Sequence, residues 1–118
     1  MTEAEAKWLF DIQESCDALI EHVSSTPTLV AYLASRTVRA AVERELIVIG
    51  EAVNRIRKGP SGIEVADAQR IVQFRNHIVH GYDSIQHASV WLVIQQHIPI
   101  LRAEVVRLLI STSSNTRE

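Results

Sequence analysis

Side chains that could do chemistry gather in one segment, FRNHIVHGYD, residues 74–83. Within eight positions this segment holds Arg75, Asn76, His77, His80 and Tyr82. Arginine can grip a phosphate through two parallel hydrogen bonds, and histidine titrates near neutral pH. Asparagine and tyrosine add further hydrogen-bond donors. The residue types therefore favour phosphate chemistry.

The spacing within the segment divides these side chains between two directions. Asn76, His77 and His80 are three or four residues apart, so they share one face of a helix. Arg75 precedes His80 by five residues, which places it about 140° away around an ideal helix. The two could meet through the long arginine side chain, through a distorted last turn, or across a two-fold axis between subunits.

Other chemistries fit the segment less well. It lacks a reactive serine or cysteine, which disfavours nucleophilic catalysis. His77 and His80 with Asp83 have no HExxH pattern or cysteine partner to complete a metal site. The plain structural alternative is a helix end in which histidines interact with the helix dipole and Gly81 forms a left-handed cap. RNA supplies its own 2′-hydroxyl nucleophile, so a metal-free ribonuclease needs little beyond a base and a cation.

Length and composition suit one compact helical domain spanning residues 1–118. The net charge of −2 excludes a broadly basic nucleic-acid coat but leaves room for a local basic site. The single cysteine, Cys16, excludes an intramolecular disulfide, indicates a reducing compartment, and lies on an apolar stripe where burial is expected. The start is acidic, unlike a signal peptide, and no apolar run reaches the ~20 residues that span a membrane. A cytoplasmic protein is expected.

The first two helices are expected over residues 3–24 and 29–58, the second with a break near residues 35–37. Thr2 and Glu5 have the spacing of a capping box for the first helix. Gly50 lies inside the second helix, where glycine costs about 1 kcal/mol relative to alanine, so a close helix–helix approach is predicted there. The first apolar stripe is Trp8, Ile12, Cys16, Leu19 and Val23, and the second is Val42, Leu46, Ile49, Val53 and Ile56.

The third helix is expected from a capping box of Ser61 and Glu64 to about His80. Asp83 or Ser84 is expected to cap the last helix, and Pro99 to kink or divide it. The residues of the last helix expected to face inward are Ala88, Trp91, Ile94, Ile98, Leu101, Val105 and Leu108. Residues 110–118 form a polar tail that is expected to fray. The predicted fold is all-α, an up-and-down bundle of four main helices, with a helical dimer compatible with the second apolar seam.

The segment RNHIVHGY, residues 75–82, resembles the R-x4-H-x-Y motif of HEPN-domain proteins, specifically the HepT-like toxins paired with MntA-like nucleotidyltransferase antitoxins. The segment AVERELIVIGEA (41–52) resembles the family's segment before this motif, and SVWLVIQQHIPIL (89–101) resembles the one after it. The similarity covers the central and C-terminal two-thirds of the chain.

The resemblance implies a homodimeric helical bundle with a composite ribonuclease cleft at the subunit interface and no cofactor. Arg75 and His80 would be the catalytic pair, with Asn76 and His77 as supporting phosphate-binding residues. Tyr82 matches the tyrosine to which the cognate antitoxin adds AMP, a modification that brings bulk and negative charge to the RNA path. The implied partners are RNA, a second copy of the chain and an MntA-like antitoxin.

Further residues have more than one interpretation. The cations Arg36, Arg39, Arg44, Arg55, Arg57 and Lys58 could line an RNA groove, although a solvated face is the favoured reading. Glu43 could orient a motif residue, and Trp8 and Trp91 are expected in the core. Two alternatives to the ribonuclease remain: a non-catalytic subunit that binds a nucleotidyltransferase or presents a substrate to it, and a bare dimerisation module.

Overall fold

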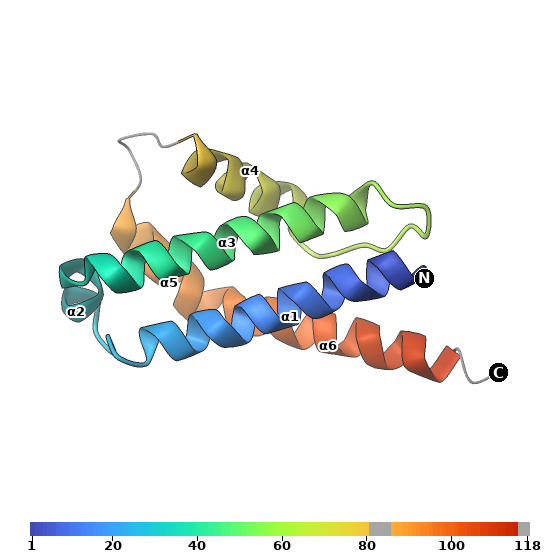
Figure 1. The fold of residues 1–118 in the computed structure, drawn as a ribbon, viewed down its shortest axis with the longest axis horizontal. Helices are drawn as coiled ribbons and strands as arrows, with labels where there is room; N and C mark the ends of the chain where they lie inside the picture. The colour runs from blue at the N-terminus through green and yellow to red at the C-terminus, as the bar shows by residue number, and fades with distance from the viewer. Residues whose placement is uncertain (81–85, 116–118) are drawn as a thin grey trace.

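The computed structural model describes the backbone of residues 1–80 and 86–115, and the side chains of residues 1–80 and 86–111. Its helices are α1 (Glu3–Val23), α2 (Leu29–Ala34), α3 (Arg36–Arg57), α4 (Ala68–Val79), α5 (His87–Gln96) and α6 (Ile98–Asn115) (Figure 1). Within the described residues there is no β-strand. The predicted all-α bundle is confirmed, with α2–α3 and α5–α6 as the two divided helices.

The first helix begins where its capping box predicts. The Thr2 hydroxyl accepts a hydrogen bond from the N–H of Glu5 (3.1 Å), and the Glu5 carboxylate accepts one from the N–H of Thr2 (2.9 Å). These two bonds satisfy N–H groups that the first turn of a helix leaves without partners. Cys16 is buried on the inner face of α1, as predicted.

Both breaks have local causes. Ser35 adopts an extended conformation (φ −105°, ψ 97°) between α2 and α3, and its hydroxyl accepts a hydrogen bond from the N–H of Val38 at 3.2 Å. It therefore ends one helix and caps the next. Pro99 lies in the first turn of α6, where its missing N–H costs no helical hydrogen bond, and α5 ends at Gln96 before it.

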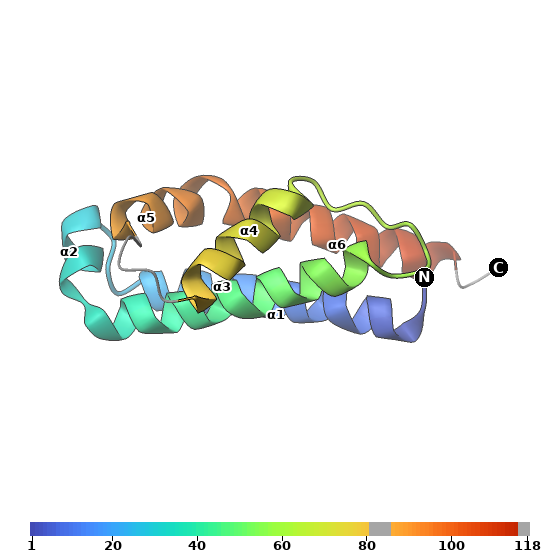
Figure 2. The ribbon, with the colours of Figure 1, turned by 90° about the horizontal axis from the view of Figure 1, so that it is seen from above.

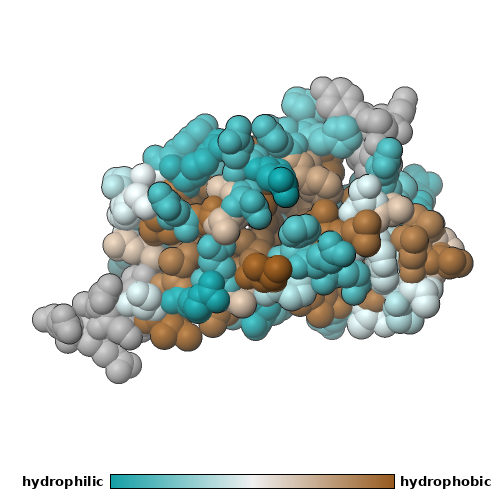
Figure 3. All heavy atoms as spheres, turned by 180° about the vertical axis from the view of Figure 1, so that it is seen from behind, coloured by the Kyte–Doolittle hydropathy of each residue, from teal (hydrophilic) through white to brown (hydrophobic). Residues whose placement is uncertain are grey.

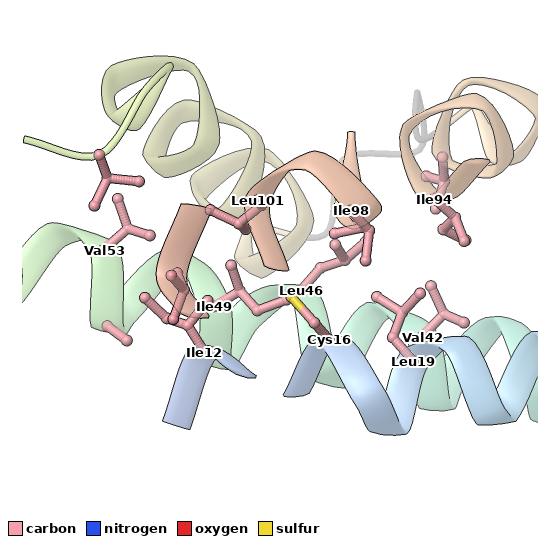
Figure 4. Close-up of a cluster of buried hydrophobic side chains, with 14 of the residues drawn as sticks. Ile12, Cys16, Leu19, Val42, Leu46, Ile49, Val53, Ile94, Ile98 and Leu101 are labelled. Atoms are coloured by element: carbon pink, nitrogen blue, oxygen red, sulfur yellow. The ribbon is translucent and has the colours of Figure 1, made fainter. Parts of the chain in front are cut away.

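The core lies between α1, α3 and the α5–α6 pair (Figures 1 and 4). Cys16 and Leu19 of α1 point toward Leu46 and Val42 of α3, and Ile98 at the start of α6 closes the same cluster. Each of these side chains is at most 5 % exposed. Burial of such a side chain contributes roughly 1.5–3 kcal/mol, so this cluster holds the three layers together.

The predicted start of the third helix is wrong. The structure begins α4 at Ala68, with Asp67 at its N-terminus in the left-handed conformation (φ 59°) and without a side-chain cap. Ser61 does not cap a helix, because its hydroxyl and N–H both donate to the carboxylate of Glu5 in α1 (2.6 and 3.4 Å). A tertiary partner has replaced the local one.

The last helical pair differs from expectation at its start and at its end. Ala88 is exposed and Val90 is buried, so the inward stripe of α5 begins two residues later than predicted. α5 starts at His87 after Gln86, whereas the predicted caps Asp83 and Ser84 lie outside the described residues, as does the predicted cap Gly81. Residues 110–115 of the expected frayed tail continue the α6 helix.

None of the described helices is long and apolar enough to cross a membrane. On the face shown in Figure 3, apolar side chains nevertheless reach the surface among hydrophilic ones. The exposed large apolar residues of α5 and α6 include Leu92, Ile100 and Ile110.

Candidate active site

The motif residues lie on and after α4, a helix that packs chiefly against α3 (Figures 1 and 2). Val72 and Ile78 are the buried side chains of α4, and Ile71 and Phe74 are half-buried beside them. Figure 2 shows α4 crossing over α3 on the outside of the bundle. The placement of the motif therefore depends chiefly on the interface between α4 and α3.

At the centre of that interface, Arg75 of α4 lies directly on Gly50 of α3. A Cβ atom built at Gly50 would come within 2.3 Å of the Arg75 Cβ and 2.6 Å of its Cγ. No side chain other than hydrogen fits between the two helices there. The close approach predicted for Gly50 is confirmed, and its partner is a motif residue.

Arg75 thus belongs to the packed side of α4. Its side chain is half-buried, and its Nε atom is buried without a hydrogen-bond partner among the described residues. A buried N–H without a partner is unusual in a folded protein.

His80 lies at the opposite side of the helix end. It is exposed, and it terminates α4 with its N–H donating to the Asn76 carbonyl at 3.0 Å. Its backbone is still helical (φ −75°, ψ −2°), so ideal helix geometry places its side chain about 140° from that of Arg75. The backbone therefore places the two motif residues on different sides of α4.

The remaining motif residues differ in their exposure and in whether the structure describes them. Asn76 and His77 are half-buried on the side of α4 that carries His80. Tyr82 lies outside the described residues. Among the side chains of residues 1–80 and 86–111, no group of three or more His, Cys, Asp or Glu is gathered closely enough to hold a metal ion.

The outer surface of α4 is basic and polar. Arg70, Gln73, His77 and His80 recur every three or four residues, which puts them on one face of the helix. Arg70, Gln73 and His80 are exposed and His77 is half-buried. The helix contains no acidic residue, although the whole chain is weakly acidic. This face suits an anionic ligand.

Two of the arginines of α3 have local partners. Arg39 donates to the carbonyl of Leu33 at the end of α2, and Arg57 donates to the side chain of Asn54 at 2.9 Å. These contacts fit the favoured reading of a solvated, locally bonded charged face.

Glu43 lies seven residues before Gly50 and therefore on the same face of α3. It is half-buried. Burial of the Tyr32 hydroxyl raises the pKa of Tyr32 to about 12, and the negative charge of Glu43 adds to this rise. The ring of Tyr32 packs on Trp91 with centroids 5.4 Å apart. Trp8 and Trp91 both pack against the core, as predicted.

Two contacts that the sequence did not predict hold the loop before α4. Glu5 binds Ser61 at one end of this loop, and at the other end the Glu104 carboxylate of α6 accepts hydrogen bonds from the N–H of Ala66 at 3.0 and 3.2 Å. The hydrogen bonds from Ser61 and Thr2 lower the pKa of Glu5 to about 2. No local spacing could have revealed either contact, because each joins residues far apart in sequence.

A cavity of about 150 Å³ lies between α4 and the α5–α6 junction. Its walls are largely apolar and include Ile71, Phe74 and the exposed Ile100, while Arg70 and His97 contribute polar groups to its lining. The cavity therefore adjoins the outer face of the motif helix.

Comparison with known proteins identifies the family of this chain. A family model described as "Ribonuclease HepT-like" matches residues 12–108. A protein of Methanocaldococcus jannaschii named "Putative RNase MJ1380" is 28% identical over 103 residues, covering 83% of this chain and 90% of that protein. No solved structure is significantly similar. Because the family model spans most of the chain, including α4 and both helices that flank it, the chain belongs to the HepT-like ribonuclease family.

Proposed function

We propose that this chain is a metal-independent endoribonuclease that acts as a homodimer and serves as the toxin of a toxin–antitoxin pair. Membership of the HepT-like ribonuclease family supports the reaction class. The observation that carries the proposal is the division of the motif, with Arg75 packed on α3 and His80 exposed at the end of α4.

The two residues have complementary roles in RNA cleavage. His80 helps to remove the proton of a ribose 2′-hydroxyl, whose oxygen then attacks the neighbouring phosphorus. Arg75 stabilises the negative charge that builds up on the phosphorane oxygens. The bond from phosphorus to the 5′-oxygen breaks, and that oxygen takes up a proton from water. Asn76 and His77 hold the phosphate.

A second copy of the chain completes the site. Two motif helices related by a two-fold axis would bring Arg75 of one copy toward His80 of the other, which a single straight helix does not do. The apolar cavity beside α4 and the exposed Ile100 at its rim support an association surface at this place.

The basic outer face of α4 supports an anionic substrate. Arg70, Gln73 and His77 follow one line along the helix that leads to His80. Single-stranded RNA binds through such lines of cationic and hydrogen-bonding groups, without base-specific contacts. RNA is therefore proposed to reach His80 along this face.

Tyr82 is proposed as the point of control. A nucleotidyltransferase antitoxin of the MntA-like class would add AMP to its hydroxyl. Its position two residues after His80 supports this, because a bulky anion there would repel the RNA backbone.

The decisive experiment is RNA cleavage in EDTA by the wild-type chain, by Arg75→Ala, by His80→Ala and by an equimolar mixture of the two variants after subunit exchange. Neither variant alone is expected to cleave. The mixture should regain activity, because one composite site in each mixed dimer holds both residues. Circular dichroism and size-exclusion chromatography establish that all chains are folded and associated.

The outcomes separate the alternatives. If wild type cleaves RNA but the mixture stays inactive, both residues of each site come from the same chain. Cleavage that requires an added divalent cation contradicts metal independence. A wild type without activity, but with binding to a nucleotidyltransferase, supports the non-catalytic subunit.

A further inference from the structure

We infer that Gly50 is a positioning residue for Arg75: the absence of a side chain at Gly50 sets how deeply the arginine stem lies against α3. The inference rests on the proposed function only where it concerns cleavage. The contact itself is a property of the helix interface.

The steric argument is direct. A Cβ atom essentially never comes within 3.0 Å of a non-bonded heavy atom of another side chain, and a Cβ at Gly50 would lie 2.3 Å from the Arg75 Cβ. The obstructing atom is attached to the α4 backbone, so no rotation of the arginine side chain can move it away. Any larger residue at position 50 must displace α4 itself. The neighbouring Ile71 carbonyl, 3.6 Å from the same point, limits a shift in its direction.

The contact also restricts the position of the Arg75 guanidinium group. With Cβ and Cγ of Arg75 resting on Gly50, its Nε atom is buried and only the outer part of the side chain can reach solvent. The stem is thus held by packing, whereas an exposed arginine has several free torsions. Preorganised donors of this kind stabilise charge in a transition state without having to reorder first.

Energetically, glycine is the wrong residue for the middle of a helix. It destabilises a helix by roughly 0.5–1 kcal/mol relative to alanine. Gly50 lies well inside α3, between buried Ile49 and Ala52, so the helix would be more stable with alanine if α4 were absent. The glycine offsets this cost by leaving room for Arg75 to pack against α3.

The test is Gly50→Ala, compared with Gly62→Ala as a matched control. Gly62 lies in the loop before α4 with φ +65° and open space around its Cβ direction, so its substitution strains the backbone without touching Arg75. Displacing a catalytic group by about 1 Å can cost 10²-fold in rate. Gly50→Ala should therefore lower kcat by about 10–100-fold with little change in KM, whereas Gly62→Ala should change neither by more than about 3-fold.

A second measurement does not depend on cleavage. In Arg75→Gly the obstructing Cβ is gone, so Gly50→Ala should no longer destabilise the protein there. In the wild-type background the same substitution should lower Tm by at least about 5 °C. If Gly50→Ala does not fold, the double variant Gly50→Ala/Arg75→Gly should recover the fold.

A third readout is the Arg75 Nε–H resonance in NMR spectra. Burial should make its hydrogen exchange slowly, and Gly50→Ala should shift or lose this protection while Gly62→Ala leaves it in place. Equal destabilisation by Gly50→Ala in both backgrounds, or an unchanged Arg75 resonance, would overturn the inference. A wild-type chain that cleaves no RNA refutes the proposed function instead, and the Tm cycle and the NMR signal still decide whether Gly50 positions Arg75.

Discussion

The carboxylate of Glu5 in α1 accepts a hydrogen bond of 2.6 Å from the hydroxyl of Ser61, 56 residues later in the chain. The same carboxylate completes the capping box of α1. One buried acidic side chain therefore fixes both the start of the first helix and the loop that leads into the motif helix.

This contact predicts a specific acid sensitivity. The pKa of Glu5 is about 2 in the folded chain, below its ordinary value of 4.5. A carboxyl group with a lowered pKa stabilises the fold fully above its unfolded value and loses that contribution as pH falls through the folded value. Urea unfolding should thus show a loss of stability between pH 4.5 and 2 that Glu5→Gln lacks. Parallel pH profiles for wild type and Glu5→Gln would contradict this assignment, and Ser61→Ala should shift the transition upward in pH.

Arg70 tests the outer face of α4 as the RNA path. When a protein loses one cationic side chain that contacts a phosphate of single-stranded RNA, the slope of log K against log salt becomes shallower by about 0.7. Arg70→Ala should produce a change of this size in RNA binding, measured by fluorescence anisotropy across a salt series. Arg55→Ala is the control, because Arg55 is exposed on α3 outside that face. Equal slopes for Arg70→Ala and wild type would move the RNA path elsewhere.

A substitution at Tyr82 tests the proposed control by AMP addition separately from the proposed cleavage reaction. Tyr82→Phe keeps the ring but removes the hydroxyl that would receive AMP. The variant should cleave RNA within about 3-fold of the wild-type rate, since the hydroxyl has no proposed part in the reaction. It should also stay active after treatment with the antitoxin and ATP. Mass spectrometry of wild type should show an added AMP that Tyr82→Phe lacks, and an added AMP on the variant would place the modification on another residue.

Cys16 should be inert in the native protein. The thiol is fully buried, and burial raises its pKa to about 12, so almost no reactive thiolate is present near neutral pH. An aromatic disulfide reagent at pH 8 should react with it only after urea is added. Ser24→Cys, on an exposed residue, supplies the positive control. Rapid reaction of native Cys16 would mean that the α1 core opens readily.

The sequence predicted those features that short-range chemistry determines. Thr2 and Glu5 cap α1 because both partners lie within one turn, and Gly50 revealed a close approach because glycine inside a helix needs a reason. Ser61 and Glu64 had the same capping spacing, but the Ser61 hydroxyl donates to the buried Glu5 carboxylate instead of accepting from the N–H groups of a new helix. A local pattern states what a residue can do, and tertiary contacts decide between its partners.

The site was harder to predict for the same reason. The types of Arg75 and His80 and their angular separation follow from the sequence. The sequence did not say which of the two faces the bundle, because the packed side of α4 depends on where α3 lies. Val90 in place of Ala88 on the inner side of α5 is a similar case, because the buried side of α5 depends on where α2 and α6 lie.

The attachment of α4 mainly to α3 has a consequence for the native-state energy landscape. A helix held by one neighbour and two loop anchors opens at a lower free energy than α1 or α3, which lie in the core, and so behaves as a separate cooperative unit. Amide hydrogens of residues 68–80 then exchange before those of the core. Any molecule that binds the outer side of α4 only when this helix is folded also stabilises the folded helix against local opening. Binding at that surface therefore increases the fraction of molecules in which the motif is ordered.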